Sequence, residues 1–565
     1  MCPIASRSDC RGASPRAFRR APLLLTACLA ALGGHGPASA VPHVDALTFP
    51  VSGLSPFNPQ CSNTSFGGLL QPNTEVEPFV ASNPQDPLNL VGVWQQDRWT
   101  SGGAQGQGTG YSFDGGVTWH RLFLPFTVCA GGNAANGGNY QRASDPWVSF
   151  SPNGVVHQSA LAFDLFAPPD QVSSAILASR STDGGKTWSP PATLITDTAD
   201  HVDDKDTITA DPTDSRYVYA TWERVSSLPN EGLGPTMVAR SVDNGATWEP
   251  ASIAYDPGPL AQTLGNRIEV LPDGTLLDLF ALIDFGAQTV TLQVIRSSDK
   301  GATWSAPTFI ADDLAIGASD PDTGEVIRDG VPIPQMAISP TGKISVVWQD
   351  ARFSGGLRDG IVLSESTDGG TTWSAPVQIN HDPLVVAFTP SVRVREDGTV
   401  GVSYYDLRHN TPDPATLPTD LWLTRSRDGL TWRESRVTDT FDLATAPVAF
   451  GLFLGDYQGI TSIGPVFVPF FAKTTGDPAD PDDIYAHLAL PRHRAGASLG
   501  SPALAAQVAL EEASLPVTHA RAMDRTMSEV PPALRIAAWR AMERSLRARI
   551  PDWDSRMAAR QAAWR

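Results

Sequence analysis

Basic residues are scarce in this sequence compared with acidic ones. Lysine and arginine number 41 against 60 aspartates and glutamates, so the 565 residues carry a net charge of −19. This charge would repel a nucleic acid or an anionic membrane, and the sequence therefore argues against both as partners. Charged residues make up only 18 % of the chain and apolar residues 41 %, which is typical of a folded, soluble protein.

Long apolar runs are absent beyond the N-terminus, so no transmembrane segment is predicted. The N-terminus itself resembles an export signal, because Arg16, Arg19 and Arg20 precede the short apolar stretch Ala21–Gly33 and a small-x-small cleavage site follows at Ala38–Ala40. We predict a signal peptide over residues 1–40 and a secreted or periplasmic protein. Lipoprotein anchoring at Cys28 is a less favoured interpretation, because little of the apolar stretch precedes that cysteine.

Cysteine is rare, and only Cys61 and Cys129 lie beyond the predicted signal peptide. In an exported protein two cysteines most simply form a disulfide. No set of residues has metal-ligand spacing, and we predict no metal or cofactor. The acidic stretch Asp477–Asp483 (DPADPDD) offers oxygen ligands of the kind that calcium prefers, but solvated loop acids are the favoured interpretation.

The most abundant feature is a repeated phrase that reads STDGGKTW at Ser181. Glycine (49 residues) and proline (48) are frequent, which predicts many turns. Successive copies of the phrase lie 56 to 69 residues apart, a period typical of propeller blades. The copies begin at Ser112, Ser181, Ser241, Ser297, Ser366 and Ser426.

Each repeat unit predicts four short antiparallel strands, which is the pattern of a propeller blade. In the unit around Ser366 they are Pro334–Pro340, Ile344–Gln349, Gly360–Ser364 and Ala375–Ile379. Seven segments read as first strands, so we predict seven blades, with six as the alternative if the last strands are used otherwise. The segments begin near Glu77, Asp145, Asp206, Arg267, Pro334, Pro390 and Asp456.

The two ends of the chain complete this prediction. The last unit lacks a fourth strand, which Val44–Val51 is expected to supply and so close the ring. After residue 490 the composition changes, and Leu534, Ala538, Met542 and Leu546 recur at helical spacing. We predict an all-β propeller over residues 41–490 and a helical extension over 491–565. The extension either docks on the propeller or binds a protein partner.

The repeated phrase is expected to be structural, because it falls between the third and fourth strands of each blade. Its Ser and Asp side chains accept hydrogen bonds from the turn, its Gly permits a positive φ, and its Trp packs against the neighbouring blade. The pattern S-x-D-x-G-x-T-W resembles the Asp-box of the sialidase-like (BNR-repeat) propellers. The resemblance covers about Val44–Leu490 and implies the fold, but Asp-box propellers include receptors and assembly factors as well as enzymes.

Ionisable residues are expected at the axial mouth, where loops entering first strands and leaving second strands share one face. Glu77, Asp145 and Asp206 enter first strands, and Asp284 leaves a second strand. We predict that these four carboxylates bind substrate, and a polar ligand such as a glycan suits such a mouth. The alternative is that the charges pair with one another and only finish the loop ends.

The sialidase resemblance also implies a catalytic set. Sialidases grip a sugar carboxylate with three arginines and attack with a tyrosine activated by a glutamate, while an aspartate serves as acid/base. Tyr457 matches the tyrosine and Asp359 the aspartate. The arginine candidates are Arg267, Arg352 and Arg408.

The resemblance is incomplete at two places. Glu269 stands where the family has a proline after its motif arginine, and Pro332 stands at the motif arginine of the next blade. The glutamate partner of Tyr457 stays open between Glu269 and Glu325.

Three hypotheses follow for the function. The first is an exported, sialidase-like glycoside hydrolase of the exo-α-sialidase type. The second is a non-catalytic propeller that binds glycans or proteins. The third is another polysaccharide hydrolase or lyase that uses a carboxylate pair such as Asp145 and Asp206.

Overall fold

The computed structural model describes residues 47–62, 67–164, 173–228, 231–489, 518–521, 532–549, 553–555 and 557–558. The predicted signal peptide and Cys28 lie outside these residues, so both stay predictions. None of the described helices is long and apolar enough to cross a membrane.

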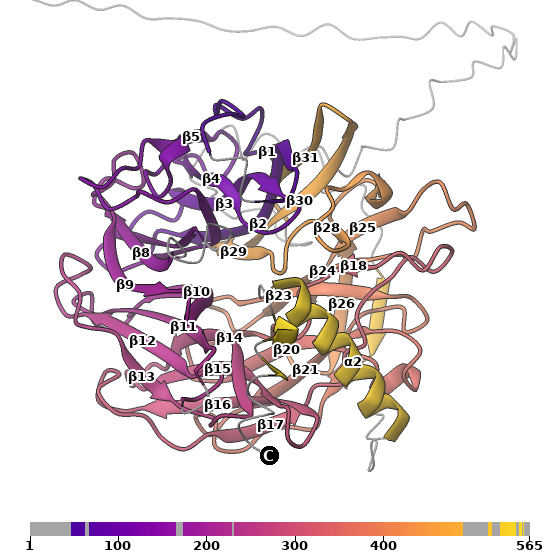
Figure 1. Cartoon of the computed structure of the whole chain (residues 1–565). Coiled ribbons are helices and arrows are strands. Elements are labelled where there is room, and N and C mark those ends of the chain that lie inside the picture. The colour runs from indigo at the N-terminus through magenta and orange to yellow at the C-terminus, as the bar shows by residue number, and fades with distance from the viewer. Residues whose placement is uncertain are drawn as a thin grey trace, which may run out of the picture. The chain divides into compact units, whose positions relative to one another are not determined.

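The fold is a β-propeller, and most of its described strands form seven antiparallel groups of four, which we number as blades 1 to 7 (Figure 1). Blade 1 consists of β2 (Leu70–Ser82), β3 (Leu90–Trp99), β4 (Ala104–Ser112) and β5 (His120–Phe123), and blade 2 of β6 (Arg142–Phe150), β7 (Val156–Phe163), β8 (Ser173–Ser181) and β9 (Ala192–Thr198). Blade 3 consists of β10 (His201–Ala210), β11 (Val218–Ser226), β12 (Thr236–Ser241) and β13 (Ser252–Tyr255). Blade 4 consists of β14 (Ala261–Val270), β15 (Leu276–Asp284), β16 (Thr289–Ser297) and β17 (Thr308–Asp312).

Blades 5 to 7 complete the set. Blade 5 consists of β19 (Gln335–Ile338), β20 (Ile344–Asp350), β21 (Gly360–Ser366) and β22 (Val377–Gln378). Blade 6 consists of β23 (Ala387–Val394), β24 (Val400–Asp406), β25 (Pro418–Ser426) and β26 (Thr431–Arg436). Blade 7 consists of β29 (Gly459–Ile463), β30 (Val466–Asp477), β31 (Asp480–His487) and the N-terminal strand β1 (Thr48–Pro50). A fifth strand, β32 (Thr518–Arg521), pairs with β26. The colour sequence in Figure 1 shows the blades following one another round the propeller.

Ring closure by the N-terminal segment is confirmed. β1 pairs antiparallel with β31, and Thr48 lies opposite His487. Leu47 and Val51, which flank the strand, are both buried. The first and last parts of the propeller are thus held in one sheet, which leaves β31 without an open edge.

The core lies between the blades, and the nearly continuous apolar second strands supply much of it. Every residue of β3, β20 and β24 is buried. Val, Ile and aromatic residues favour such strands, because their side chains fit both faces of a buried sheet.

The repeated phrase forms the turn after the third strand, as predicted. In the first copy, Asp114 accepts hydrogen bonds from the Thr118 N–H (2.9 Å) and the Thr118 hydroxyl (2.7 Å). Gly116 has a φ of 91°, which favours glycine. The ring of Trp119 lies 5.6 Å from that of Phe470 in blade 7. The phrase therefore ties its own turn together and packs against the next blade.

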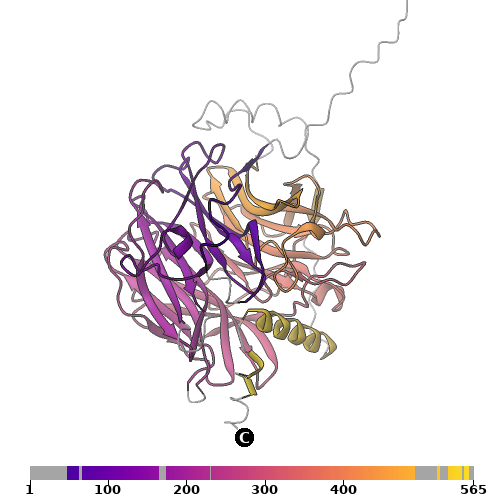
Figure 2. The same cartoon turned by 45° about the horizontal axis from the view of Figure 1, so that its top comes forward.

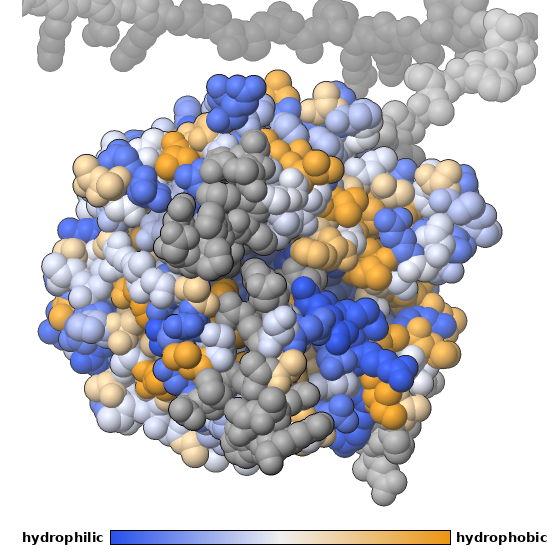
Figure 3. All heavy atoms as spheres, in the orientation of Figure 1, coloured by the Kyte–Doolittle hydropathy of each residue, from blue (hydrophilic) through white to orange (hydrophobic). Residues whose placement is uncertain are grey.

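The C-terminal helix α2 (Pro532–Arg549) confirms the amphipathic pattern. Leu534, Ala538, Met542 and Leu546 are all buried. Figures 1 and 2 show α2 against the strands of blades 4 and 5, and its outer face is hydrophilic in Figure 3. The Ser545 hydroxyl donates to the Val331 carbonyl oxygen (2.5 Å), in the loop that enters β19. The helix therefore docks on the propeller face that carries the axial mouth.

Candidate functional site at the propeller axis

The first strands line the axis, and five of them share a backbone irregularity. Their register with the second strand shifts at one point, and the residue there has a positive φ. These residues are Glu77 (55°), Asp145 (52°), Lys205 (52°), Gly265 (68°) and Thr389 (48°). Because a β-bulge re-aims its side chain, the bulges determine which groups meet at the axis. A positive φ costs free energy outside glycine and is often found at functional sites.

Three carboxylates from three blades meet the Lys205 ammonium group. Lys205 Nζ lies 2.6 Å from Asp145 Oδ1, 2.8 Å from Asp456 Oδ2 and 3.1 Å from Glu77 Oε1. All four residues are almost fully buried. Burial lowers the pKa of Lys205, but Asp145, Asp456 and Glu77 together raise it above its usual range. The lysine is therefore positively charged and pairs with acids from three parts of the chain.

Arg328 adds a second cation to this cluster from outside the first strands. It lies in the short strand β18 (Ile327–Arg328), which pairs in parallel with β28 (Leu452–Phe453). Its Nε and Nη2 atoms donate to the two oxygens of Asp456, at 2.9 and 2.6 Å. The pairing of two loops thus positions a bidentate arginine over the axis.

Glu77 lies between two protonation states at neutral pH. Burial raises its pKa to about 7, with Lys205 acting in the opposite direction and Asp145 in the same one. Two further acids, Asp206 and Glu223, are also buried beside the cluster. Burial, followed by the neighbouring Asp145, raises the pKa of Asp206 well above its usual value. The pKa of Glu223 is also raised well above its usual value, first by burial and then by the charge of Asp204.

Asp206 differs from Asp145 in its partners. Neither of its carboxyl oxygens has a hydrogen-bond partner in good geometry within the described part of the chain, although the Ser159 hydroxyl is close enough to lower its pKa. It forms no ion pair with a described residue, whereas Asp145 binds Lys205 directly. Neighbouring first strands therefore present one acid that is paired with a lysine and one whose raised pKa favours its protonated form.

A small hollow opens beside the cluster and brings together two of the sequence-predicted catalytic residues. Its lining includes Tyr457 and Arg267, together with Lys205, Asp206 and Trp147. The Arg267 guanidinium lies 5.3 Å from the centre of the Trp147 ring, and the Tyr457 and Trp147 rings are 5.1 Å apart. Asp206, which is predicted to bind substrate, and Tyr457, the predicted nucleophile, thus line the same hollow.

Tyr457 is buried, and its hydroxyl donates to the Pro146 carbonyl oxygen (3.2 Å). Burial, and then Glu77, Asp145 and Asp206, raises its pKa well above the usual value. Neither proposed glutamate partner is placed to activate it, because Glu269 pairs with Arg267 (2.7 Å) and Glu325 is exposed in a loop. The glutamate whose charge acts most on Tyr457 is Glu77, and it disfavours the tyrosinate.

The three arginines predicted to form a cluster each pair with an acid of their own. Arg352 donates to both oxygens of Asp350, at 2.8 and 2.6 Å. Arg408 donates to Asp406 (2.6 Å) and Glu434 (2.6 Å) and stacks on Trp422. Neither arginine lines the hollow that contains Arg267. Each one neutralises an aspartate two residues before it, which fixes the loop end locally.

Asp359 and Asp284 do not line the hollow either, although Asp284 ends a second strand as predicted. The Asp359 carboxylate is fully buried and accepts hydrogen bonds from the backbone N–H groups of Ile316 (2.9 Å) and Gly317 (2.8 Å). Asp284 accepts from the N–H groups of Gly286 and Ala287, both at 2.8 Å, in the turn after β15. Both residues therefore organise loops and stand outside the lining of the hollow.

The two cysteines form a disulfide, as predicted. Cys61 and Cys129 are bonded, and their Cα atoms lie 5.2 Å apart. The bond ties the segment after β1 to the loop between blades 1 and 2.

Sequence reasoning missed Lys205 and Arg328 as members of the axial cluster, whereas Asp456 is predicted at the mouth because it enters the last first strand. Lys205 has a signal in the sequence, because it occupies the same place in its first strand as Glu77 and Asp145 do in theirs. Arg328 has none, because a two-residue parallel strand between loops leaves no periodic pattern.

Comparison with known proteins agrees with the repeat. The family model of the BNR/Asp-box repeat matches residues 111–121 and 179–190. The chain is also similar to three solved structures. The first is the Hadza microbial sialidase Hz136, at 16 % identity over 70 % of this chain and 76 % of that one, with a TM-score of 0.40. The second is an α-L-arabinanase of Penicillium chrysogenum complexed with arabinobiose, at 12 % identity over 78 % of this chain and 98 % of that one, with a TM-score of 0.38. The third is a sialidase of Trypanosoma rangeli in complex with 2,3-difluorosialic acid, at 16 % identity over 61 % of this chain and 53 % of that one, with a TM-score of 0.37. The protein is thus a β-propeller that carries BNR/Asp-box repeats.

Proposed function

We propose that the protein is a glycoside hydrolase that cleaves a neutral glycan at the axial cluster. The observation that carries the proposal is the unlike pair Asp145 and Asp206 on neighbouring first strands. Asp145 forms an ion pair with Lys205, whereas Asp206 forms none with a described residue and has a raised pKa that favours its protonated form. Glycoside hydrolysis needs this combination of a general acid and a carboxylate base or nucleophile.

A neutral substrate fits the charge around the pair. Six acids surround the axis, namely Glu77, Asp145, Asp204, Asp206, Glu223 and Asp456, against the cations Lys205, Arg328 and Arg98. Lys205 and Arg328 are already bound to these acids. A sugar carboxylate would therefore meet more acids than cations at the axis.

A sialidase activity is the second candidate, because Arg267 and Tyr457 line the same hollow. In this alternative Arg267 exchanges Glu269 for a sugar carboxylate, and Tyr457 acts as nucleophile. A non-catalytic glycan-binding propeller is the third outcome, and it predicts binding without release of product.

The three candidates separate in one assay on the purified protein. We expect turnover of a neutral member in a panel of fluorogenic glycosides that also includes a sialoside. Asp206→Asn should reduce kcat by about 10²- to 10⁴-fold, because it removes the proton donor while preserving shape. Asp284→Asn is the matched control and should retain activity, since that carboxylate belongs to a turn.

Other results would assign the protein differently. Turnover of the sialoside alone, abolished by Tyr457→Phe, would establish the second candidate. Glycan-array binding with no turnover of any substrate would overturn hydrolysis. Full activity in Asp206→Asn would remove the proposed acid.

A further inference from the structure

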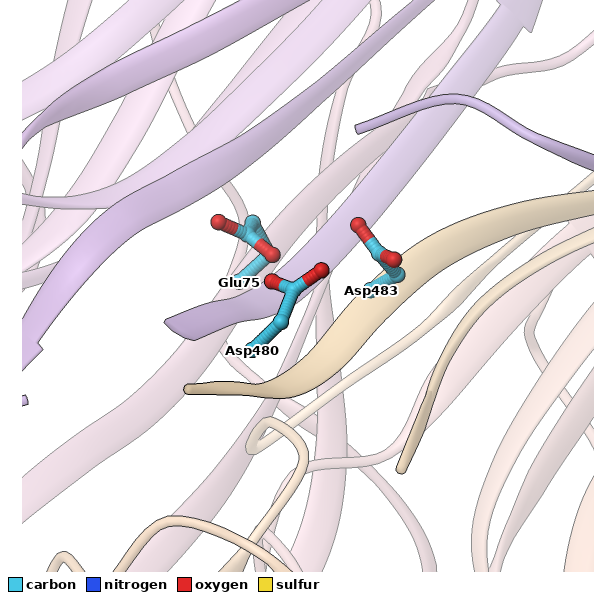
Figure 4. Close-up of side chains that lie close together, drawn as sticks. All are labelled: Glu75, Asp480 and Asp483. Carbon is cyan, nitrogen blue, oxygen red and sulfur yellow. The ribbon is translucent and has the colours of Figure 1, made fainter. Parts of the chain in front are cut away.

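Three carboxylates meet at the seam between blades 1 and 7, away from the axial hollow. Glu75 comes from β2, and Asp480 and Asp483 come from β31. Each offers an oxygen that lies within 4.8 Å of the others. Figure 4 shows the three side chains turned toward one another across the two strands.

Glu75 is the unusual member, because its carboxyl group is fully buried and only half satisfied. One oxygen accepts a hydrogen bond from the Gln96 amide. The other, Oε2, is buried and has no hydrogen-bond partner among the described residues. An oxygen in this position needs a proton or a cation, since an unpaired buried charge costs several kcal/mol.

The surroundings of Glu75 add negative charge. Burial raises its pKa well above the usual value, and Asp482 and Asp483 raise it further. Asp482 accepts a hydrogen bond from the Glu75 N–H (3.2 Å). On the cationic side, Arg121 lowers the pKa of Asp483, and Lys473 lies opposite Asp483 in the β30–β31 register.

We propose that Glu75, Asp480 and Asp483 bind a divalent cation, with Ca²⁺ as the preferred ion. Ca²⁺ takes only oxygen ligands at about 2.3–2.6 Å, so two ligand oxygens on one ion lie at most about 5.2 Å apart. The spacing of these carboxylates falls within that limit. Mg²⁺ demands shorter bonds and a near-ideal octahedron, and it keeps much of its water, so it fits three inward-facing carboxylates less well.

The site has a structural consequence, because it joins three separate parts of the chain. Glu75 belongs to blade 1, and Asp480 and Asp483 belong to blade 7. Asp483 also accepts a hydrogen bond from the Ser52 hydroxyl (2.7 Å), directly after the closing strand β1. A bound cation therefore fastens the ring at the place where its first and last blades meet.

Calcium titration of the full chain after dialysis against EDTA tests this site. We expect isothermal titration calorimetry to show binding of about one Ca²⁺ per chain, with weaker heat for Mg²⁺. Ca²⁺ at a hundred times its Kd should raise Tm by about 2–5 °C. The variants Glu75→Gln and Asp480→Asn should lose both effects.

Asp477→Asn is the matched control in the same hairpin. The Asp477 carboxylate accepts from the Ala479 N–H (2.9 Å) and stands outside the three-carboxylate group, so this variant should bind Ca²⁺ as the wild type does. If Glu75→Gln does not fold, Asp480→Asn decides the matter, because that side chain is only partly buried. Wild-type protein without Ca²⁺ heat, or undiminished binding in Asp480→Asn, would overturn the proposal.

Discussion

Asp278 is a carboxyl group enclosed in the middle of β15. One oxygen accepts a hydrogen bond from the Thr221 hydroxyl (2.9 Å), and the other is buried with no partner in good geometry, although the Arg267 backbone N–H is close enough to lower the pKa. Burial raises the pKa of Asp278 to about 7. The native state therefore keeps a proton that the unfolded state releases near pH 4. The stability that comes from Asp278 is full below that pH and is lost as the pH rises through about 7.

The pH dependence of stability tests this assignment. Asp278→Asn needs no proton. The difference between its free energy of unfolding and that of the wild type should therefore shift in favour of the variant by about 2–3 kcal/mol between pH 5 and pH 8. Urea unfolding at both pH values measures the gain. Asp273→Asn is the control, because turn hydrogen bonds lower the pKa of Asp273 and keep it ionised throughout. Parallel pH profiles for Asp278→Asn and the wild type would contradict the assignment.

At the same scale, the sequence predicts which residue types gather at the axis but not how they pair. Glu77, Asp145 and Asp206 were all expected at the mouth, and all three lie beside Lys205. The bulges that aim these side chains are a property of the backbone and have no fixed residue type. The loop arginines were assigned to substrate, although the D-x-R spacing of Asp350 with Arg352 equally predicts a local ion pair.

At the scale of the element, α2 is the part with the clearest periodicity. Its apolar face joins one core cluster with β16 and β20, and the ring of Trp539 lies 5.4 Å from that of Phe285. Strands with continuous apolar runs were equally predictable. Two-residue elements such as β18 were not, because their pairing depends on loops brought together by the closed ring.

Loosening α2 should expose the C-terminal segment to protease while the propeller stays folded. Leu546→Ala removes a fully buried side chain and should weaken docking by about 2–5 kcal/mol. Limited trypsin digestion should then cleave the segment faster, and the Tm of the propeller should change little. Ile536→Ala is the control, since Ile536 is 54 % exposed on the same helix. Equal cleavage of the two variants would show that the apolar face does not hold the helix.

For the whole molecule, repetition makes the architecture predictable. Six turn phrases and seven first strands establish the order of the blades before any contact is known. The seam between the ends is different, because Glu75 and Asp480 are 405 residues apart and no repeat relates them. The stretch Asp477–Asp483 (DPADPDD) taken alone predicts a solvated loop. The buried Glu75, which changes this interpretation, comes from another blade.

The final prediction concerns the loss of the closing strand β1. A chain that begins at residue 52 lacks Leu47 and Val51, each of which contributes about 1.5–3 kcal/mol through burial. It also leaves β31 as an open edge able to pair with another chain. We expect this chain to have a lower Tm than one that begins at residue 47, and to associate as its concentration rises. Thermal unfolding and size-exclusion chromatography of the two chains measure both effects. Equal Tm values and equal elution would mean that blade 7 is stable with three strands and that closure contributes little to the fold.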